Sequence, residues 1–238
     1  MILNIETSNQ ACSAAVTDAG EVQFEKIERD GMSHARLLAP FVQECMDYIR
    51  RHDAKPEAIA VSIGPGSYTG LRIGLSMAKG LCMGLDVPLL GIPTLEILAV
   101  KAMFSHHDWQ GDELLIPMLD ARRMEVYTAT YDFALNAVEP VRPLILDENS
   151  FADLLAQGRK LVFIGPGAVK FEPLFRQAHP EAGDQALFLT KLIPDARGMM
   201  ALSERALRRG DLLDLAYSVP EYLKEFQATV PRNKVLGC

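Results

Sequence analysis

Residues 59–84 constrain the fold of this chain more than any other stretch of its sequence. An apolar run ends at Gly64-Pro65-Gly66, and a long helical pattern follows directly. The glycines allow backbone angles and close approaches that a side chain would block, and Pro65 stiffens the turn. The order therefore predicts a strand, a rigid turn and a helix. The turn either cradles an anion on the first amides of the helix or aims that helix at a partner.

The helix after this turn carries a small residue at every fourth position, namely Gly70, Gly74, Ala78 and Cys82. Such a row lets a second helix approach closely and pack ridge into groove. The helix has few charges, so most of its circumference needs to be covered by other parts of the protein. Two interpretations stay open, an ordinary helix pair within one domain and a contact with a partner chain.

The common nucleotide-binding and catalytic motifs are absent from the chain. The glycine turn lacks the lysine of a Walker loop and the third glycine of a dinucleotide-binding turn. No GxSxG nucleophile elbow and no HExxH zinc motif occurs, and the histidines include no i, i+4 pair. The sequence therefore predicts neither a bound metal nor a cofactor.

Charge and cysteine usage narrow the class of protein. The net charge of −7 argues against a chain that wraps nucleic acid by itself. The four cysteines form neither CxxC pairs nor cysteine–histidine zinc spacings, which favours free thiols in a reducing compartment. The N-terminus lacks the features of a signal peptide, and no apolar stretch approaches the roughly 20 residues that span a bilayer. We therefore expect a cytoplasmic protein without membrane contact.

The predicted elements repeat in the second half of the chain. The pattern of strand, acidic residue, polar turn and strand around Glu6 returns around Asp120, and a second Gly-Pro-Gly turn stands at 165–167. A duplicated α/β unit explains this repetition, although chance similarity between common strand–turn–strand patterns also explains it. The predicted lobes are residues 1–105 and 106–238.

Glu6 and Asp120 are the acidic residues that end the two predicted strands. Two duplicated lobes that face one another across a cleft would place both carboxylates near a nucleotide and its metal. The alternative is that each acid caps its own turn by accepting hydrogen bonds from backbone amides.

Four motifs together resemble the TsaB family, also described as YeaZ or glycoprotease-like: Ile5-Glu6-Thr7-Ser8, Gly64-Pro65-Gly66-Ser67-Tyr68-Thr69-Gly70-Leu71-Arg72, Lys79-Gly80-Leu81 and Leu119-Asp120-Ala121-Arg122. The resemblance spans nearly the whole chain, including Pro220-Glu221-Tyr222-Leu223-Lys224. It implies the actin-like ATPase fold, an α/β fold with two duplicated ribonuclease-H-like lobes. It also implies a part in making threonylcarbamoyladenosine in tRNA, with the catalytic relative TsaD and the ATPase TsaE as partners. A homodimer is implied when the chain is alone, and its negative charge predicts no strong independent binding of tRNA.

The chain departs from TsaD at the metal site of that relative. TsaD carries an Asn-His-Leu-Glu-Gly-His stretch, and the matching residues here are 93–98. Thr94 and Leu98 replace the two histidines; threonine is a poor metal ligand and leucine is none. The resemblance therefore implies a non-catalytic paralogue, and the sequence gives no support to a protease activity.

The resemblance also implies which residues form the sites. The helices at 34–51 and 70–84 are expected to pack against the equivalent helices of TsaD or of a second copy. The expected interface residues are His34, Leu38, Phe41, Cys45, Gly70, Ile73, Gly74, Met77, Ala78 and Leu81. The expected vestigial nucleotide site comprises Glu6, Thr7, Ser8, Asp120, Gly165 and Gly167. The alternative function is a self-sufficient ATPase or phosphotransferase of the actin-like class.

Overall fold

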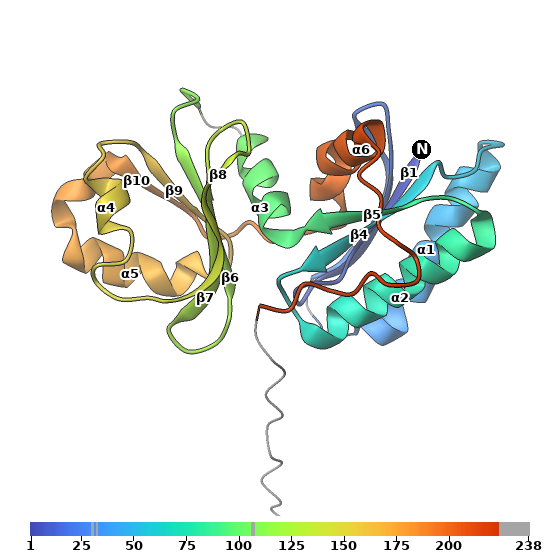
Figure 1. The fold of residues 1–238 in the computed structure, drawn as a ribbon, viewed down its shortest axis with the longest axis horizontal. Coiled ribbons are helices and arrows are strands. Elements are labelled where there is room, and N and C mark those ends of the chain that lie inside the picture. Colours follow the sequence, from blue (N-terminus) through green and yellow to red (C-terminus); the bar gives the residue numbers. More distant parts are fainter. Residues whose placement is uncertain (30, 32, 106–107, 224–238) are drawn as a thin grey trace, which may run out of the picture.

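Two five-stranded sheets lie beside each other in the computed structural model, which describes residues 1–29, 31, 33–105 and 108–223 (Figure 1). The first sheet has the order β3-β2-β1-β4-β5, with β1 Ile2–Glu6, β2 Cys12–Asp18, β3 Glu21–Glu28, β4 Ala58–Gly64 and β5 Leu89–Pro93. The second has the order β8-β7-β6-β9-β10, with β6 Leu114–Asp120, β7 Glu125–Tyr131, β8 Ala137–Ile145, β9 Leu161–Ile164 and β10 Ala186–Leu189.

The two sheets share their strand order and their strand directions. β1 pairs antiparallel with β2 and parallel with β4, and β6 pairs in the same two ways with β7 and β9. The outer pairs follow suit, since β2–β3 and β7–β8 are antiparallel while β4–β5 and β9–β10 are parallel. The duplication is therefore confirmed, and with it the two-lobed actin-like α/β fold.

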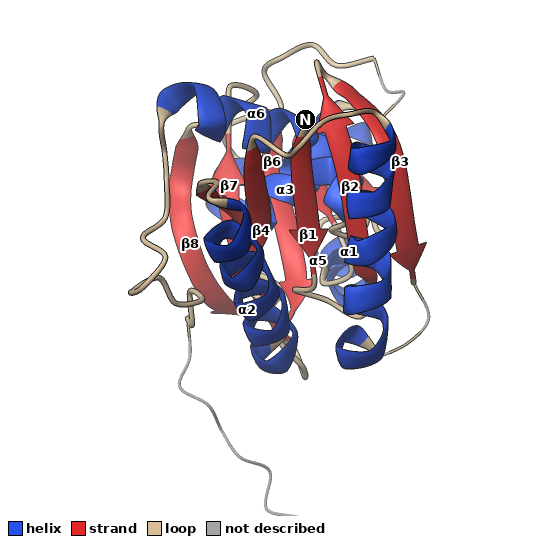
Figure 2. Ribbon diagram, turned by 90° about the vertical axis from the view of Figure 1, so that its right-hand side faces the viewer, coloured by secondary structure: helices blue, strands red, loops and turns tan. Residues whose placement is uncertain are grey.

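Helices α1 (His34–Arg51) and α2 (Tyr68–Leu85) lie side by side across one face of the first sheet (Figure 2). Successive side chains of a strand point to opposite faces, so alternate residues of the buried strands feed different layers. Leu3, Ile5 and Val61 pack toward α1 and α2, whereas Ile2 and Ala60 pack on the other side of the sheet.

Helix α3 (Thr94–Met103) joins the two lobes. One side of it, with Leu95 and Leu98, packs against the second sheet, and Ile97 and Val100 pack against the first. The 3₁₀ helix η2 (Ala196–Met199) and helix α6 (Met200–Arg209) then return to the first sheet and bury Met199 and Leu202 there. This differs from the expected lobe 106–238, because residues 196–209 of that range pack on the first lobe.

The outer face of the second sheet is covered by α4 (Ala152–Leu155), α5 (Ala168–Ala178) and η1 (Pro180–Gln185). Its core is aromatic: the rings of Phe163, Phe171 and Phe175 lie 5.2 to 5.5 Å apart between centroids. Large aromatic side chains contribute much buried area each, which suits a lobe with short helices.

Residues 211–223, called the C-terminal strap below, run along the first lobe beside α2 (Figure 1). The Leu213 amide donates to the Leu89 carbonyl at 2.8 Å, and the Glu221 amide donates to the Ile63 carbonyl at 2.7 Å. The strap is therefore anchored by backbone bonds at β4 and β5. No sequence pattern predicted this strap.

The cysteines were expected to be free thiols. Cys12, Cys45 and Cys82 are free and buried, and burial raises the pKa of the Cys45 thiol to about 12. Cys238 lies outside the described residues. No helix within the described parts of the chain is long and apolar enough to cross a membrane.

Candidate partner-binding face

The row of small residues on α2 faces the chain's own sheet. A Cβ atom on Gly70 would lie 2.1 Å from the Thr7 carbonyl oxygen, and one on Gly74 would lie 2.3 Å from Thr7 Oγ1. The Thr7 hydroxyl donates to the Gly70 carbonyl at 2.8 Å, and Ala78 is fully buried. The row therefore lets α2 approach the end of β1. This corrects the assignment of Gly70, Gly74 and Ala78 to a partner contact, since these residues are not available to a second chain.

The predicted residues of α1 divide in the same way. His34 is buried, with Nε2 3.1 Å from the Ala11 carbonyl oxygen, and Leu38 and Cys45 belong to the core. Phe41 is half-buried and packs against that core from its edge. His34, Leu38 and Cys45 therefore support the fold and do not reach a partner.

A hollow of about 660 Å³, called the α1–α2 groove below, opens between the two helices on the outer surface. Ile73, Met77 and Leu81, three of the predicted interface residues, line it from α2. The remaining lining residues, which the sequence analysis missed, are Ala35, Arg72, Ser76 and Gly80. Ser76 and Gly80 could have been predicted from the sequence, because helical periodicity puts positions 73, 76, 77 and 80 on one face. The groove is mostly apolar, and none of its described lining residues carries a carboxylate.

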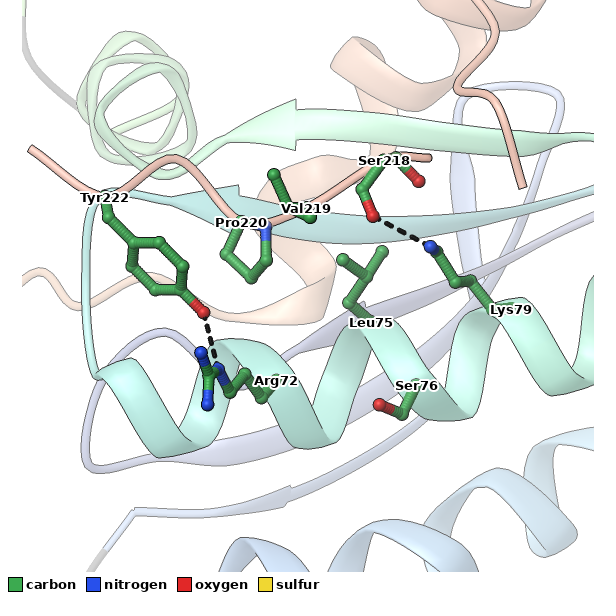
Figure 3. A pocket seen from close by; sticks show the side chains of 8 residues that line it. All are labelled: Arg72, Leu75, Ser76, Lys79, Ser218, Val219, Pro220 and Tyr222. Atoms are coloured by element: carbon green, nitrogen blue, oxygen red, sulfur yellow. Dashed lines mark hydrogen bonds between the residues drawn. The ribbon is translucent and has the colours of Figure 1, made fainter. Parts of the chain in front are cut away.

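A second hollow, of about 240 Å³, separates α2 from the C-terminal strap (Figure 3). Lys79 Nζ donates to the Ser218 carbonyl at 2.7 Å, and Arg72 Nε donates to the Tyr222 hydroxyl at 2.8 Å. This last hydrogen bond raises the pKa of Arg72 above its usual range. Arg72 and Ser76 line both hollows, so the strap is continuous with the rim of the α1–α2 groove.

The first-lobe residues of the predicted nucleotide site, Glu6, Thr7 and Ser8, are buried and packed against the chain. Glu6 is fully buried at the end of β1, where its Oε1 accepts from the Ser8 amide while Oε2 has no partner. Burial raises the pKa of Glu6 to about 7. The Ser8 carbonyl accepts from the Ser67 amide at 2.6 Å, and a Cβ on Gly66 would lie 2.4 Å from that carbonyl oxygen. The polar turn after β1, with Thr7 and Ser8, therefore binds the glycine turn.

In the second lobe, Gly165 and Gly167 of the predicted nucleotide site are packed against the chain, whereas Asp120 lies at the surface. Asp120 is exposed, and its Oδ1 accepts from the Arg122 amide at 2.7 Å and from Lys170 Nζ at 2.8 Å. Asp120 thus caps its own turn. Gly165 has φ +99°, and a Cβ there would lie 2.8 Å from Leu98 Cδ1, while one on Gly167 would lie 2.8 Å from Val126 Cγ1.

Thr94 and Leu98, which the resemblance sets against the TsaD histidines, are both buried. Thr94 and Leu98 are fully buried on α3, and Glu96 between them pairs with Arg205 of α6 at 2.6 Å. Within the described residues, no three side chains of the His, Cys, Asp and Glu types gather where they could hold a metal ion.

The comparisons with known proteins agree on one family. The model of the TsaD family, described as tRNA N6-adenosine threonylcarbamoyltransferase, matches residues 28–230. The tRNA threonylcarbamoyladenosine biosynthesis protein TsaB of Escherichia coli is 28% identical over 94% of both chains. TsaB of Bacillus subtilis is 34% identical over 69% of this chain and 70% of its own.

Solved structures give the same picture. YeaZ from Pseudomonas aeruginosa superposes with a TM-score of 0.74 at 26% identity, covering 93% of this chain and 99% of its own. The superposition therefore includes both lobes. The chain belongs to the TsaB family and takes part in the biosynthesis of tRNA threonylcarbamoyladenosine.

Proposed function

We propose that this chain is a non-catalytic scaffold subunit that binds TsaD, and with it TsaE, for transfer of the threonylcarbamoyl group to tRNA. The observation that carries the proposal is the α1–α2 groove, an apolar hollow on a surface that the chain's own elements leave open. A helix with an apolar face fits such a groove by ridge-into-groove packing. TsaD shares the fold of this chain's family, so its equivalent helices are the natural occupants.

The same groove accounts for a homodimer when TsaD is absent. A contact between two identical grooves is isologous, because the same patch is used on both copies. Ile73 and Met77 lie one helical turn apart, and such spaced apolar side chains are the anchors of a helix docked against a helix. The homodimer and the complex with TsaD would then compete for one surface.

The closed acid and glycine positions support the non-catalytic part of the proposal. Glu6 is buried beneath its own turn, and Leu98 fills the space beside Gly165. A leucine side chain offers no lone pair to a metal ion. The chain then contributes structure to the complex, and TsaD contributes the chemistry. Because the pathway modifies tRNA, we place the complex in the cytoplasm.

The test uses Gly80→Glu, because a Cβ at Gly80 meets nothing within 4 Å and the variant leaves the core intact. Burying an unpaired carboxylate in the apolar groove is expected to weaken TsaD binding at least about 100-fold. Gly84→Glu is the matched control, since Gly84 is also open, lies on the same helix and does not line the groove. Affinity is measured by calorimetry, and tRNA modification is reconstituted with each variant. Wild-type affinity for Gly80→Glu would contradict the proposal.

The alternative, a self-sufficient ATPase, has one observation in its favour. Glu6 holds a buried carboxyl oxygen without a partner, a feature more typical of functional sites than of structural ones. Calorimetry of the full chain with ATP and Mg²⁺ tests this alternative. Stoichiometric binding with turnover that Glu6→Gln abolishes would support it, and absence of binding would exclude it.

A further inference from the structure

Arg72 is held in place more firmly than an exposed arginine ordinarily is. Its guanidinium carbon lies 4.0 Å from the ring centroid of Tyr68 and 5.7 Å from that of Tyr222, and the two rings lie 4.7 Å apart. Arg72 Nε also donates to the Tyr222 hydroxyl at 2.8 Å (Figure 3). Two aromatic rings and one hydrogen bond therefore fix a cation at the rim of the α1–α2 groove.

The position of Tyr222 depends on the strap. The neighbouring Glu221 amide bonds to β4, Pro220 is buried, and Lys79 binds the Ser218 carbonyl. A Cβ on Gly64 would lie 2.7 Å from the Glu221 carbonyl oxygen, so the glycine turn is shaped to admit this part of the strap. The strap thus brings the Tyr222 ring to Arg72, which lies 150 residues earlier in the chain.

Arg72 has aromatic partners, whereas several other arginines of the described chain pair with carboxylates. The arginines that form ion pairs with carboxylates are Arg50, Arg142, Arg176, Arg197, Arg205 and Arg208. The groups that act on Arg72 are the two tyrosines, and no carboxylate lines the groove beside it. The groove therefore presents one positive charge that no described carboxylate neutralises.

We infer that Arg72 is a preorganised anchor for a carboxylate on the TsaD helix that docks in the α1–α2 groove, with Tyr68 and Tyr222 as its positioning residues. The inference rests on the proposed function. Arginine binds carboxylates in a planar, two-pronged geometry, and a side chain ordered before binding loses less entropy on association. Arginine and tyrosine are also the residue types most enriched among those that dominate interface energies.

The occupant is a helix with an apolar ridge and one acidic residue at its edge. Charge complementarity selects it, because the groove is apolar except at Arg72 and Ser76. A cation between two tyrosines would also suit a stacked nucleobase. The net charge of −7 and the use of Lys79 by the strap carbonyls favour the acidic helix over RNA.

The experiment measures the affinity of full-length Arg72→Gln and Tyr222→Phe for TsaD from the same organism, at low and at moderate salt. We expect Arg72→Gln to weaken binding at least 10-fold and to flatten its salt dependence, since a charge pair is lost. Tyr222→Phe keeps the ring and loses only the hydroxyl, so we expect a loss of about 2- to 5-fold. Arg176→Gln, on α5 of the other lobe, is the control and should bind as wild type. Thermal unfolding shows that each variant is folded.

A scan of single acidic residues on the docked TsaD helices then identifies the carboxylate, because its removal should cost nothing further when Arg72 is already Gln. Such non-additivity would support the inference. If Arg72→Gln binds TsaD as wild type while Gly80→Glu does not, the inference is wrong and the proposed function stands. If both bind as wild type, both are wrong. If Arg72→Gln keeps its TsaD affinity but weakens tRNA binding by the complex, Arg72 contacts RNA instead, and the inference is likewise wrong.

Discussion

Each lobe has a strand, a Gly-Pro-Gly turn and a helix in the same order, but the two helices differ in which side chains face the sheet and which face outward. In the first lobe, Gly70 and Gly74 bring α2 against the end of β1, and larger apolar side chains remain on its outer side. In the second lobe, Phe171 and Phe175 fill the space between α5 and its sheet, and the outer side carries the ion pair Glu172–Arg176. In both lobes the glycine turn packs closely against the end of a neighbouring strand. The two helices therefore differ most on their outer sides.

The acids that end β1 and β6 also differ from each other. Glu6 is fully buried and its carboxyl group has an unpartnered oxygen, whereas Asp120 is exposed and pairs with Lys170. Glu6 is thus part of a closed core, and Asp120 is part of a surface turn. The two strand ends therefore share a backbone arrangement but not the surroundings of their acids.

The second lobe should be the more sensitive to loss of volume. Phe171 is 1% exposed and its ring meets those of Phe151 and Phe163 at 5.6 and 5.2 Å. Phe171→Ala leaves a cavity and is expected to lower the free energy of unfolding by about 4 kcal/mol. Urea denaturation measures it, with exposed Val169→Ala as the control. A loss below about 1 kcal/mol would show that the lobe collapses around the cavity.

The first lobe should be the more sensitive to added volume. Gly74→Leu drives a side chain into Thr7, which a Cβ alone would approach to 2.3 Å, and overpacking of this kind is expected to cost about 3 kcal/mol. Gly80→Leu, where nothing lies within 4 Å, is the control in the same denaturation experiment. Unchanged stability of Gly74→Leu would mean that α2 can move away from β1, and the contrast between the lobes would fail.

The buried carboxyl group of Glu6 is expected to make the free energy of unfolding depend on pH. Burial raises the pKa of Glu6 from 4.5 to about 7, so the native chain holds a proton that the unfolded chain has released. The free energy of unfolding therefore falls as the pH rises from about 4.5 to about 7. Glu6→Gln removes this effect and is expected to stabilise the chain by about 3 kcal/mol at pH 8 and by nothing below pH 4.5.

The control for this prediction is Asp120→Asn, the equivalent change in the second lobe. Asp120 is exposed and paired with Lys170, and exposed ion pairs contribute about 0 to 1 kcal/mol. Denaturation of both variants between pH 4.5 and pH 8 separates them. A flat difference between Glu6→Gln and wild type across this range would show that Glu6 does not titrate in the window.

The sequence predicted the strands around Glu6 and Asp120, the glycine turns with their helices, the duplication and the family, because apolar runs and turn residues are local signals. It did not predict β8 or β10. It did not decide which way the small-residue row of α2 faces. A glycine row fits a partner helix and the chain's own backbone equally well, and Thr7, which decides the matter, lies more than 60 residues away. The strap escaped prediction for a related reason. Its anchors at Leu213 and Glu221 are backbone hydrogen bonds, which leave no residue pattern.

The smallest predicted effect concerns the outer side of α2 alone. Gly80 and Gly84 both lie within the helix with open space around them, so replacing either with alanine should add about 0.5 to 1 kcal/mol to the free energy of unfolding. Gly80 lines the α1–α2 groove and Gly84 does not. We therefore expect Gly80→Ala to weaken TsaD binding a few-fold despite its gain in stability, and Gly84→Ala to leave binding unchanged. Equal TsaD affinities of Gly80→Ala and Gly84→Ala would show that the partner helix does not contact Gly80. Only the inner side of α2 would then pack closely against another element.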